Sequence, residues 1–257
     1  MSAPKRPVVS VIVVTYNSAS IIERCLCAVR EQTGVSREVL VVDNDSRDDT
    51  VGVVRGRFPE ASVIESGGNV GFAAANNRGL EHARGRFVFF LNPDAFLEPD
   101  AMATLVAALE ARPEAAVCAP RLLNADGSLQ YSARNFPTVP NQLFEALMLH
   151  KVMRHSSCRW GDVIYDPGFY TTDRSVDWLS GAALLVRAEA LEEVGGFDER
   201  FFLYSEEKDL QYRLALLGWG RMLCAGATAV HAHGDSYRQD LFLTGIRSKA
   251  AYFEKHF

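Results

Sequence analysis

Apolar segments alternate with helix-like segments five times between residues 8 and 119, and this alternation constrains the fold more than any other feature of the sequence. Most of the apolar segments are runs of valine, isoleucine, leucine or phenylalanine, which is typical of strands buried on both faces. We predict strands over 8–14, 38–42, 61–64, 87–91 and 115–119. Strands that alternate with helices indicate an α/β fold with a Rossmann-like, mostly parallel sheet covered by helices.

The regular pattern ends near residue 120. Beyond it we predict a hairpin around 124–127, a strand over 182–186, and two short strands flanking 225–226. A helix over 206–217 is expected to turn Leu210, Leu214 and Leu217 inward, and Pro99 is expected to start the helix that precedes residue 115. The chain is then expected to end in an amphipathic helix over 241–257.

Composition excludes several classes of protein. The formal charge of −5, with no long basic run, argues against a nucleic-acid-binding protein. The five cysteines are scattered without zinc-site spacing, which indicates a reducing cytoplasm. No apolar stretch approaches the roughly 20 residues that span a bilayer, and the apolar run near the N-terminus is too short for a signal peptide. We therefore expect a soluble or peripheral cytoplasmic protein.

Polar side chains follow three of the predicted strands at the point where each strand ends. They are Thr15-Tyr16-Asn17, Asp43-Asn44-Asp45 and Asn92-Pro93-Asp94. Ligands of open α/β sheets bind at this edge, and a glycine loop at 67–71 opens a helix whose free amides suit an anion. Asp43 only accepts hydrogen bonds, so it suits the imide of uracil or thymine. Asp43 and Asp45 also fit the simpler role of capping the next helix.

A diphosphate among these carboxylates would be repelled unless a cation lay between them. Hard divalent cations take oxygen ligands from one or two carboxylates and from phosphates, and Asp94 is the natural candidate. His231, at the end of a late strand, is either a second ligand or a structural histidine. Glu206, Glu207 and Asp209 start a helix, where negative charge is favourable, but one of them could instead accept a proton from an attacking hydroxyl.

Six segments, in order, resemble family 2 glycosyltransferases of the rhamnosyltransferase-like branch. They are VSVIVVTYNS, VVDNDSRDDT, GGNVGFAAANNRG, GRFVFFLNPDA, SGAALLVRAEALEEVGGFDERFFLYSEEKDLQYRLALLGWG and HAHGDS. The resemblance covers about 8–236 and is weakest over 122–174. It implies a glycosyltransferase A-type fold in a single domain, with a nucleotide-sugar-binding half over about 1–120 and a smaller acceptor and catalytic half over about 121–257.

The resemblance also assigns roles to individual residues. The residues implied to line the nucleotide are Thr15, Tyr16, Asn17, Asp43, Asn44, Asn69, Gly71, Phe72, Asn76 and Asn77. Those implied to lie near the donor sugar or the acceptor are Asn92, Trp178, Ser180, Gly181 and Glu206. Asp94 and His231 are implied to bind Mg²⁺ or Mn²⁺. Glu207 occupies the position of the catalytic base, which is an aspartate in the family, so the extra methylene moves its carboxylate.

The implied reaction is an inverting sugar transfer to a hydroxyl of a cell-surface glycan or lipid-linked acceptor, as in polysaccharide and cell-wall biosynthesis. The branch suggests dTDP-L-rhamnose as donor, with UDP-hexoses next. An inactive relative that only binds sugar nucleotides is the alternative, because of the change at Glu207. The basic and aromatic terminal helix fits either ordinary packing or a contact with the inner face of a membrane.

Overall fold

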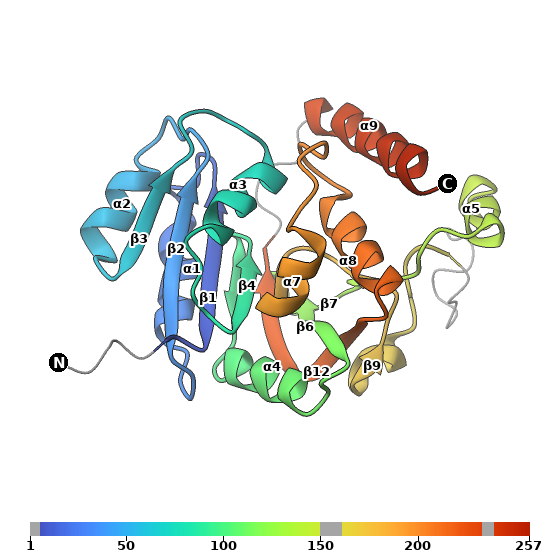
Figure 1. Ribbon diagram of the computed structural model, residues 1–257, viewed down its shortest axis with the longest axis horizontal. Helices are drawn as coiled ribbons and strands as arrows, with labels where there is room; N and C mark the ends of the chain where they lie inside the picture. The colour runs from blue at the N-terminus through green and yellow to red at the C-terminus, as the bar shows by residue number, and fades with distance from the viewer. Residues whose placement is uncertain (1–5, 150–160, 233–238) are drawn as a thin grey trace.

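The computed structural model of the protein describes residues 6–149, 161–232 and 239–257, without the side chains of 239–242. Among these residues, one large sheet of ten strands has the order β3-β2-β1-β4-β11-β6-β12-β5, with β7 and β9 attached to it. Figure 1 shows this sheet running through the molecule. A second, two-stranded sheet pairs β8 (Ala133–Arg134) with β10 (Trp178–Leu179). The α/β fold with a mostly parallel sheet is therefore confirmed.

The first four predicted strands form a parallel unit. They are β1 (Val9–Thr15), β2 (Arg37–Asp43), β3 (Ala61–Glu65) and β4 (Phe87–Leu91). The helices between them are α1 (Ile22–Arg30), α2 (Thr50–Arg57) and α3 (Phe72–Leu80). The carboxyl ends of these strands meet along one edge, because Thr15 of β1 lies opposite Asp43 of β2.

The second half adds strands of both directions to the same sheet. β11 (Ala183–Arg187) inserts antiparallel between β4 and β6 (Ala115–Leu123). β12 (Gly220–His231) runs parallel to β6, and β5 (Ala95–Leu97) pairs antiparallel with β12. The remaining elements are α4 (Ala101–Glu110), β7 (Leu129–Gln130), α5 (Val139–Ala146), a 3-10 helix at Pro167–Thr171, β9 (Arg174–Ser175), α7 (Ala188–Val194), α8 (Glu206–Leu216) and α9 (Gln239–His256).

Helices cover both faces of the sheet, so β4 is buried on each side. Phe87, Phe89 and Leu91 of β4 pack into the core beneath α1, α2 and α4. Val88 and Phe90 point the other way, into the core beneath α3, α7 and α8. This alternation is the two-residue period of a strand, and it explains why the run is apolar throughout. Helix α9 lies outside these layers and stands next to α8 (Figure 1).

Three local predictions were wrong. Helix α8 ends at Leu216, so Leu217 forms its C-cap and is 54% exposed instead of facing inward. The two short strands expected around 225–226 are one strand, β12, whose register shifts between Cys224 and Thr228. Helix α4 begins at Ala101 and not at Pro99, after a short strand, β5, that the sequence did not reveal. No helix among the described residues is long and apolar enough to cross a membrane.

Candidate active site

The loops after β1 and β2 are tied together at the sheet edge. The Thr15 hydroxyl donates to Asp43 Oδ1 at 3.0 Å, and Asp43 Oδ2 accepts the Ser46 amide at 3.0 Å. Asp43 is 5% exposed, and it does not cap α2, whose N-cap residue is Asp49. The simpler role of capping α2 is therefore excluded for Asp43. Its carboxylate is held in place at the sheet edge formed by the loops after β1 and β2, called the rim below.

Asn44 connects this rim to the glycine loop. Its Oδ1 accepts the Val70 amide at 2.9 Å, and its Nδ2 donates to Asn69 Oδ1 at 3.0 Å. Asn69 Oδ1 also accepts the Gly71 amide at 3.2 Å. Asn44 is buried, so the amide side chain acts as an internal brace that fixes the loop against the end of β2.

Two residues at this rim adopt the left-handed backbone region that side chains rarely occupy. Asn17 has φ of 51° and Asp45 has φ of 71°. The Asn17 amide donates to Ser46 Oγ, and Asn17 Oδ1 accepts the Arg47 amide at 2.7 Å. Between these braced loops Tyr16 stands 47% exposed at the edge. Backbone strain of this kind persists where the surroundings fix it, often at ligand sites.

The backbone amide that opens α3 is already hydrogen-bonded within the protein. Gly71 has φ of +88°, and a Cβ there would lie 2.6 Å from the Phe202 carbonyl oxygen. That oxygen accepts the Phe72 amide at 2.7 Å. The expectation that the amides opening this helix are free for an anion is therefore wrong for Phe72, because the segment before α8 packs against it.

Asn76 and Asn77 are also engaged within the protein. Asn76 Nδ2 donates to the Phe72 carbonyl one turn earlier, at 2.9 Å. Asn77 Oδ1 accepts the Phe197 amide at 2.9 Å, and Asn77 Nδ2 donates to the Phe197 carbonyl and to Glu199. The Asn77 side chain therefore joins α3 to the segment before α8, whereas the Asn76 side chain is hydrogen-bonded within α3 itself.

The turn at Asn92-Pro93-Asp94 meets the end of β12. Asp94 Oδ1 lies 3.3 Å from His231 Nε2, and the Asp94 carbonyl accepts the Ala232 amide at 3.0 Å. The pairing of Ala95 with His231 between β5 and β12 sets this register. Both side chains are largely buried, at 17% and 10% exposed. The rest of the HAHGDS segment, at 233–236, lies outside the described residues.

Asp94 and His231 fit a divalent cation whose coordination shell would be completed by substrate oxygens. Asn92 Oδ1 is buried and has no hydrogen-bond partner within the described part of the chain, and it lies in the same turn as Asp94. Over the same residues, no three His, Cys, Asp or Glu side chains gather into a self-sufficient metal site. Mg²⁺ is usually held by one or two protein ligands together with substrate phosphates, which is what this turn offers.

A short path of contacts joins this turn to helix α8. The Asn92 amide donates to the Ala182 carbonyl at 2.9 Å, and Gly181 precedes Ala182 in the chain. A Cβ at Gly181 would lie 3.2 Å from Cβ of Glu207 and 3.3 Å from its Cγ. The Glu207 side chain therefore lies directly against Gly181.

Glu206 and Glu207 differ in their electrostatic surroundings. Burial, reinforced by the charge of Glu207, raises the pKa of Glu206 well above its usual value. Burial also raises the pKa of Glu207, but the positive charges of Lys208 and Arg134 oppose this shift. Each residue has one buried carboxylate oxygen without a hydrogen-bond partner among the described residues. The pKa of Glu206 is therefore raised by burial and by a neighbouring anion, whereas at Glu207 two cations counteract the effect of burial.

Trp178 and Ser180 are positioned by α8 and by the small sheet. Buried Gln211 of α8 accepts the Leu179 amide at 2.9 Å and donates to the Leu179 carbonyl at 2.8 Å. The Trp178 indole donates to the Asn135 carbonyl at 3.0 Å, and the Ser180 amide donates to the Ser132 carbonyl at 3.0 Å. These bonds fix the position of the segment that contains Gly181 relative to Glu207.

Two cations near Glu207 were not predicted from the sequence. The Arg134 guanidinium lies 5.2 Å from the Trp178 ring centroid, and Lys208 Nζ lies 5.8 Å from the same ring. Lys208 also lies 3.9 Å from the Tyr252 ring centroid in α9. Their charges favour the ionised form of Glu207. Arg134 stands in the irregular middle of the chain, where no local motif marks it.

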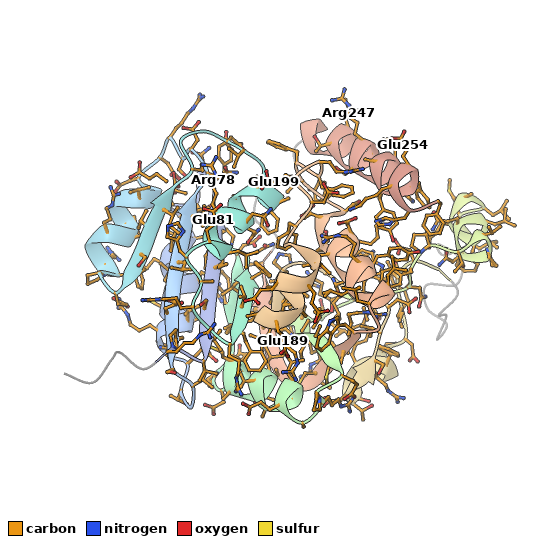
Figure 2. The ribbon with its side chains drawn as sticks, viewed as in Figure 1. Arg78, Glu81, Glu189, Glu199, Arg247 and Glu254 are labelled. Carbon is orange, nitrogen blue, oxygen red and sulfur yellow. The ribbon has the colours of Figure 1, made fainter. Side chains whose placement is uncertain are left out.

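The terminal helix, α9, is hydrogen-bonded to α8 and to the segment before it. Buried Asp209 of α8 accepts from Lys255 Nζ at 2.6 Å, from His256 Nε2 at 2.7 Å and from Arg213 Nε at 2.7 Å. The Ser248 hydroxyl donates to the Leu203 carbonyl at 2.7 Å, just before Tyr204 and Ser205, which both have φ of 68°. Figure 2 shows Arg247 and Glu254 on the outward side of α9, away from these contacts.

Comparisons with known proteins agree with this architecture. The sequence profile of Glycosyl transferase family 2 matches residues 10–194. The N-acetylglucosaminyl-diphospho-decaprenol L-rhamnosyltransferase of Mycobacterium tuberculosis is 31% identical over 244 residues, covering 91% of this chain and 78% of that protein. Rhamnosyltransferase WbbL of Escherichia coli is 28% identical over 202 residues, covering 74% of this chain and 72% of that protein.

Solved structures share the fold. Mannosyltransferase PcManGT from Pyrobaculum calidifontis, in complex with GDP-Man and Mn²⁺, superposes with a TM-score of 0.65 at 24% identity, covering 98% of this chain and 66% of that one. GalNAc-T7 with UDP, GalNAc and Mn²⁺ gives 0.66 at 16% identity, covering 91% and 44%. The expected glycosyltransferase A-type fold is confirmed. Together, the profile match and the relatives place the chain in a known family: it belongs to glycosyltransferase family 2.

Proposed function

We propose that the protein transfers L-rhamnose from dTDP-L-rhamnose, with inversion, to a hydroxyl of a lipid-linked glycan. The observation that carries the proposal is the path from Asp94 and His231 through Asn92 and Ala182 to Glu207. This path connects the proposed divalent-cation site to the proposed carboxylate base. The rhamnosyltransferases among the relatives support the donor sugar, and a UDP-hexose is the second choice.

The nucleotide is proposed to lie along the sheet edge in the first half of the chain, about 1–120. Asp43 is the acceptor for the imide N–H of thymine or uracil, and Thr15 holds that carboxylate. Tyr16 and Asn17 border the base and ribose, and the glycine loop braced by Asn44 borders the phosphates. The acceptor half, about 121–257, supplies Trp178, Ser180, Gly181 and the two glutamates, while the sheet runs through both halves.

Asp94 and His231 are the residues proposed to hold Mg²⁺ or Mn²⁺. When bound, such a cation supplies charge stabilisation for the diphosphate as it departs. Asn92 carries no charge and is assigned to the donor sugar. Its unpartnered Oδ1 can accept a hydrogen bond from a sugar hydroxyl. The chain contributes a single carboxylate at this turn, so the donor diphosphate does not face a second anion there.

Glu207 is proposed as the general base. Its carboxylate takes the proton of the acceptor hydroxyl while the hydroxyl oxygen forms a bond to the anomeric carbon. The bond from that carbon to the diphosphate oxygen breaks on the opposite face, which inverts the configuration. Burial and the charge of Glu207 raise the pKa of Glu206 beside it, and the positive charges of Lys208 and Arg134 favour the ionised form of Glu207. Positioning and electrostatics supply most of the rate enhancement.

A lipid-linked acceptor would bring the protein to the inner face of a membrane. Exposed apolar side chains on α5 and α9, or directly after them, support a peripheral contact of this kind. They are Val139, Leu143, Leu147, Leu243, Ile246 and Phe257. The proposed setting is therefore cytoplasmic, in polysaccharide or cell-wall synthesis.

A donor panel with a transfer assay tests the proposal. Thermal stabilisation by dTDP-L-rhamnose and by UDP-hexoses is measured with and without Mn²⁺, and sugar transfer is then measured onto an N-acetylglucosaminyl-diphospho-prenol analogue. We expect the largest stabilisation with dTDP-L-rhamnose and Mn²⁺, and transfer of rhamnose. Stabilisation without transfer to this or other lipid-linked acceptors would instead support the non-catalytic sugar-nucleotide-binding alternative.

A further inference from the structure

The hairpin between β6 and β7 reaches the proposed metal ligand His231. β7 and β12 both pair with β6 through Leu123, and Gln130 of β7 comes close to the end of β12. His231 Nδ1 lies 2.9 Å from Gln130 Oε1, while His231 Nε2 faces Asp94. The two ring nitrogens of His231 therefore have different partners: Nδ1 faces Gln130 of the hairpin, and Nε2 faces Asp94 of the turn after β4.

Gln130 is the last member of a chain of side-chain hydrogen bonds within the hairpin. Gln130 Nε2 donates to Asn124 Oδ1 at 3.0 Å, and Asn124 Nδ2 donates to Ser128 Oγ at 2.8 Å. The Ser128 hydroxyl in turn donates to Asp126 Oδ1 at 2.6 Å. A backbone bond from the Asn124 amide to the Ser128 carbonyl, at 2.8 Å, closes the turn around them.

The carboxylate at one end fixes the direction of every bond in this chain. Bonds from the Ser128 hydroxyl and amide lower the pKa of Asp126, so it is ionised at neutral pH and only accepts. Ser128 must then donate its one proton to Asp126 and accept from the Asn124 amide. Asn124 is left with its oxygen toward Gln130, and Gln130 with its oxygen toward His231.

A carbonyl oxygen facing His231 Nδ1 requires a proton on that nitrogen. In a neutral imidazole the proton occupies one nitrogen, so Nε2 is left with a lone pair. A lone pair is what a metal ligand needs, and Asp94 Oδ1, also an electron-pair donor, lies 3.3 Å away. Partners that fix the tautomer of a ligating histidine act in this way around protein metal sites.

We propose that the β6–β7 hairpin, through Gln130, Asn124, Ser128 and Asp126, is a positioning device that fixes the tautomer of His231 and presents its Nε2 to a divalent cation beside Asp94. The cation itself rests on the proposed function, whereas the tautomer does not. This assigns a role to the hairpin between β6 and β7, and Gln130 is its key positioning residue.

The tautomer is measured directly by nitrogen-15 NMR of the histidine side chains, without metal and at a pH where the imidazoles are neutral. The His231 signal is assigned by its loss in His231→Ala. We expect a proton on Nδ1 of His231. His256, whose Nε2 is within hydrogen-bond distance of the Asp209 carboxylate at 2.7 Å, is expected to show the opposite tautomer in the same spectrum, whereas the 3.3 Å between His231 Nε2 and Asp94 Oδ1 is longer than a normal N–H···O bond. A proton on Nε2 of His231 would overturn the proposal.

Two substitutions at Gln130 test the hairpin itself. Gln130→Leu removes the acceptor and should lose the fixed tautomer, while Gln130→Glu restores an acceptor for Nδ1 and should keep it. The affinity for Mn²⁺, measured by calorimetry with dTDP present, should fall about 10–100-fold in Gln130→Leu and much less in Gln130→Glu. Gln142→Leu on α5 makes the same chemical change away from the site, and thermal unfolding checks that each variant folds.

The outcomes separate this inference from the proposed function. If the wild type binds no Mn²⁺ with dTDP but carries the proton on Nδ1, the metal-dependent function fails and the hairpin inference stands. If the wild type binds Mn²⁺ and Gln130→Leu matches it in affinity and tautomer, the hairpin inference fails and the metal-dependent function stands.

Discussion

Asp94 Oδ1 and His231 Nε2 lie 3.3 Å apart, although one follows β4 in the first half of the chain and the other ends β12 in the second. The antiparallel pairing of β5 with β12 creates this proximity, since it sets Ala95 opposite His231. The site is therefore a product of the sheet topology. Neither the turn nor the strand end brings a carboxylate and an imidazole together on its own.

Glu207→Gln should abolish most of the transfer activity, whereas Glu206→Gln should leave it within a few-fold of the wild type. Glutamine cannot take a proton, and loss of a general base typically costs about 10²–10⁴ in rate. At position 206 the same change replaces a carboxyl whose neutral form is already favoured by burial. Steady-state kinetics with the donor varied should show an unchanged donor KM in Glu207→Gln. Near-normal turnover in that variant would contradict its role as base.

Glu206→Gln should also change how stability depends on pH. The pKa of Glu206 is raised in the folded state above its ordinary value of 4.5, so the folded protein binds more protons above that pH than the unfolded chain does. The free energy of unfolding contributed by this group therefore falls as pH rises through the folded-state pKa. In urea titrations between about pH 5 and about pH 8, the loss of stability should be smaller in Glu206→Gln than in the wild type. Parallel pH profiles would contradict a protonated Glu206.

Asp209→Ala should lower the free energy of unfolding by about 3–5 kcal/mol, because it leaves buried cations without their shared carboxylate. Asp209 is fully buried between Arg213 on its own helix and Lys255 on α9. Arg247→Ala, on the outward side of α9, is the control and should change stability by no more than about 0.5 kcal/mol. Equal effects of the two substitutions, measured by urea denaturation, would show that α9 does not hold α8 through Asp209.

Gly71→Ala should destabilise the protein more than Gly67→Ala. Both glycines have positive φ, of +88° and +72°, so both substitutions strain the backbone. Only at Gly71 would the new Cβ meet another segment, at 2.6 Å from the Phe202 carbonyl, and displace the partner of the Phe72 amide. The excess should be about 1–3 kcal/mol, the cost of one unmade buried hydrogen bond. Equal unfolding free energies for the two variants would mean that the Phe202 segment moves aside freely.

Local sequence patterns predicted the first half of the fold because its strands are apolar and clearly bounded. The strand at 87–91 has the predicted limits, since Gly85 precedes it and Pro93 cannot continue its hydrogen-bond ladder. β5 was missed because three apolar residues between a turn and a helix carry no periodic pattern. Leu217 was misplaced because its helix ends one residue before it.

The site was less predictable than the fold, because its contacts depend on pairing between distant segments. The polar residues at the strand ends indicated which side chains meet at the sheet edge. Nothing local indicated that the Phe72 amide is occupied by Phe202, or that Gln130 reaches His231 across β6. Arg134 likewise acts on Glu207 only because β8 pairs with β10.

The most direct measurement follows rhamnose transfer from dTDP-L-rhamnose to the lipid-linked acceptor analogue as Mn²⁺ is removed by a chelator and restored, in the wild type and in Asp94→Asn. We expect transfer by the wild type to stop and then recover. Asp94→Asn should transfer about 10²–10³-fold more slowly even with Mn²⁺ restored, because a metal ion contributes several kcal/mol of charge stabilisation. Undiminished transfer in the chelator, or by Asp94→Asn, would contradict a metal-dependent reaction at this turn.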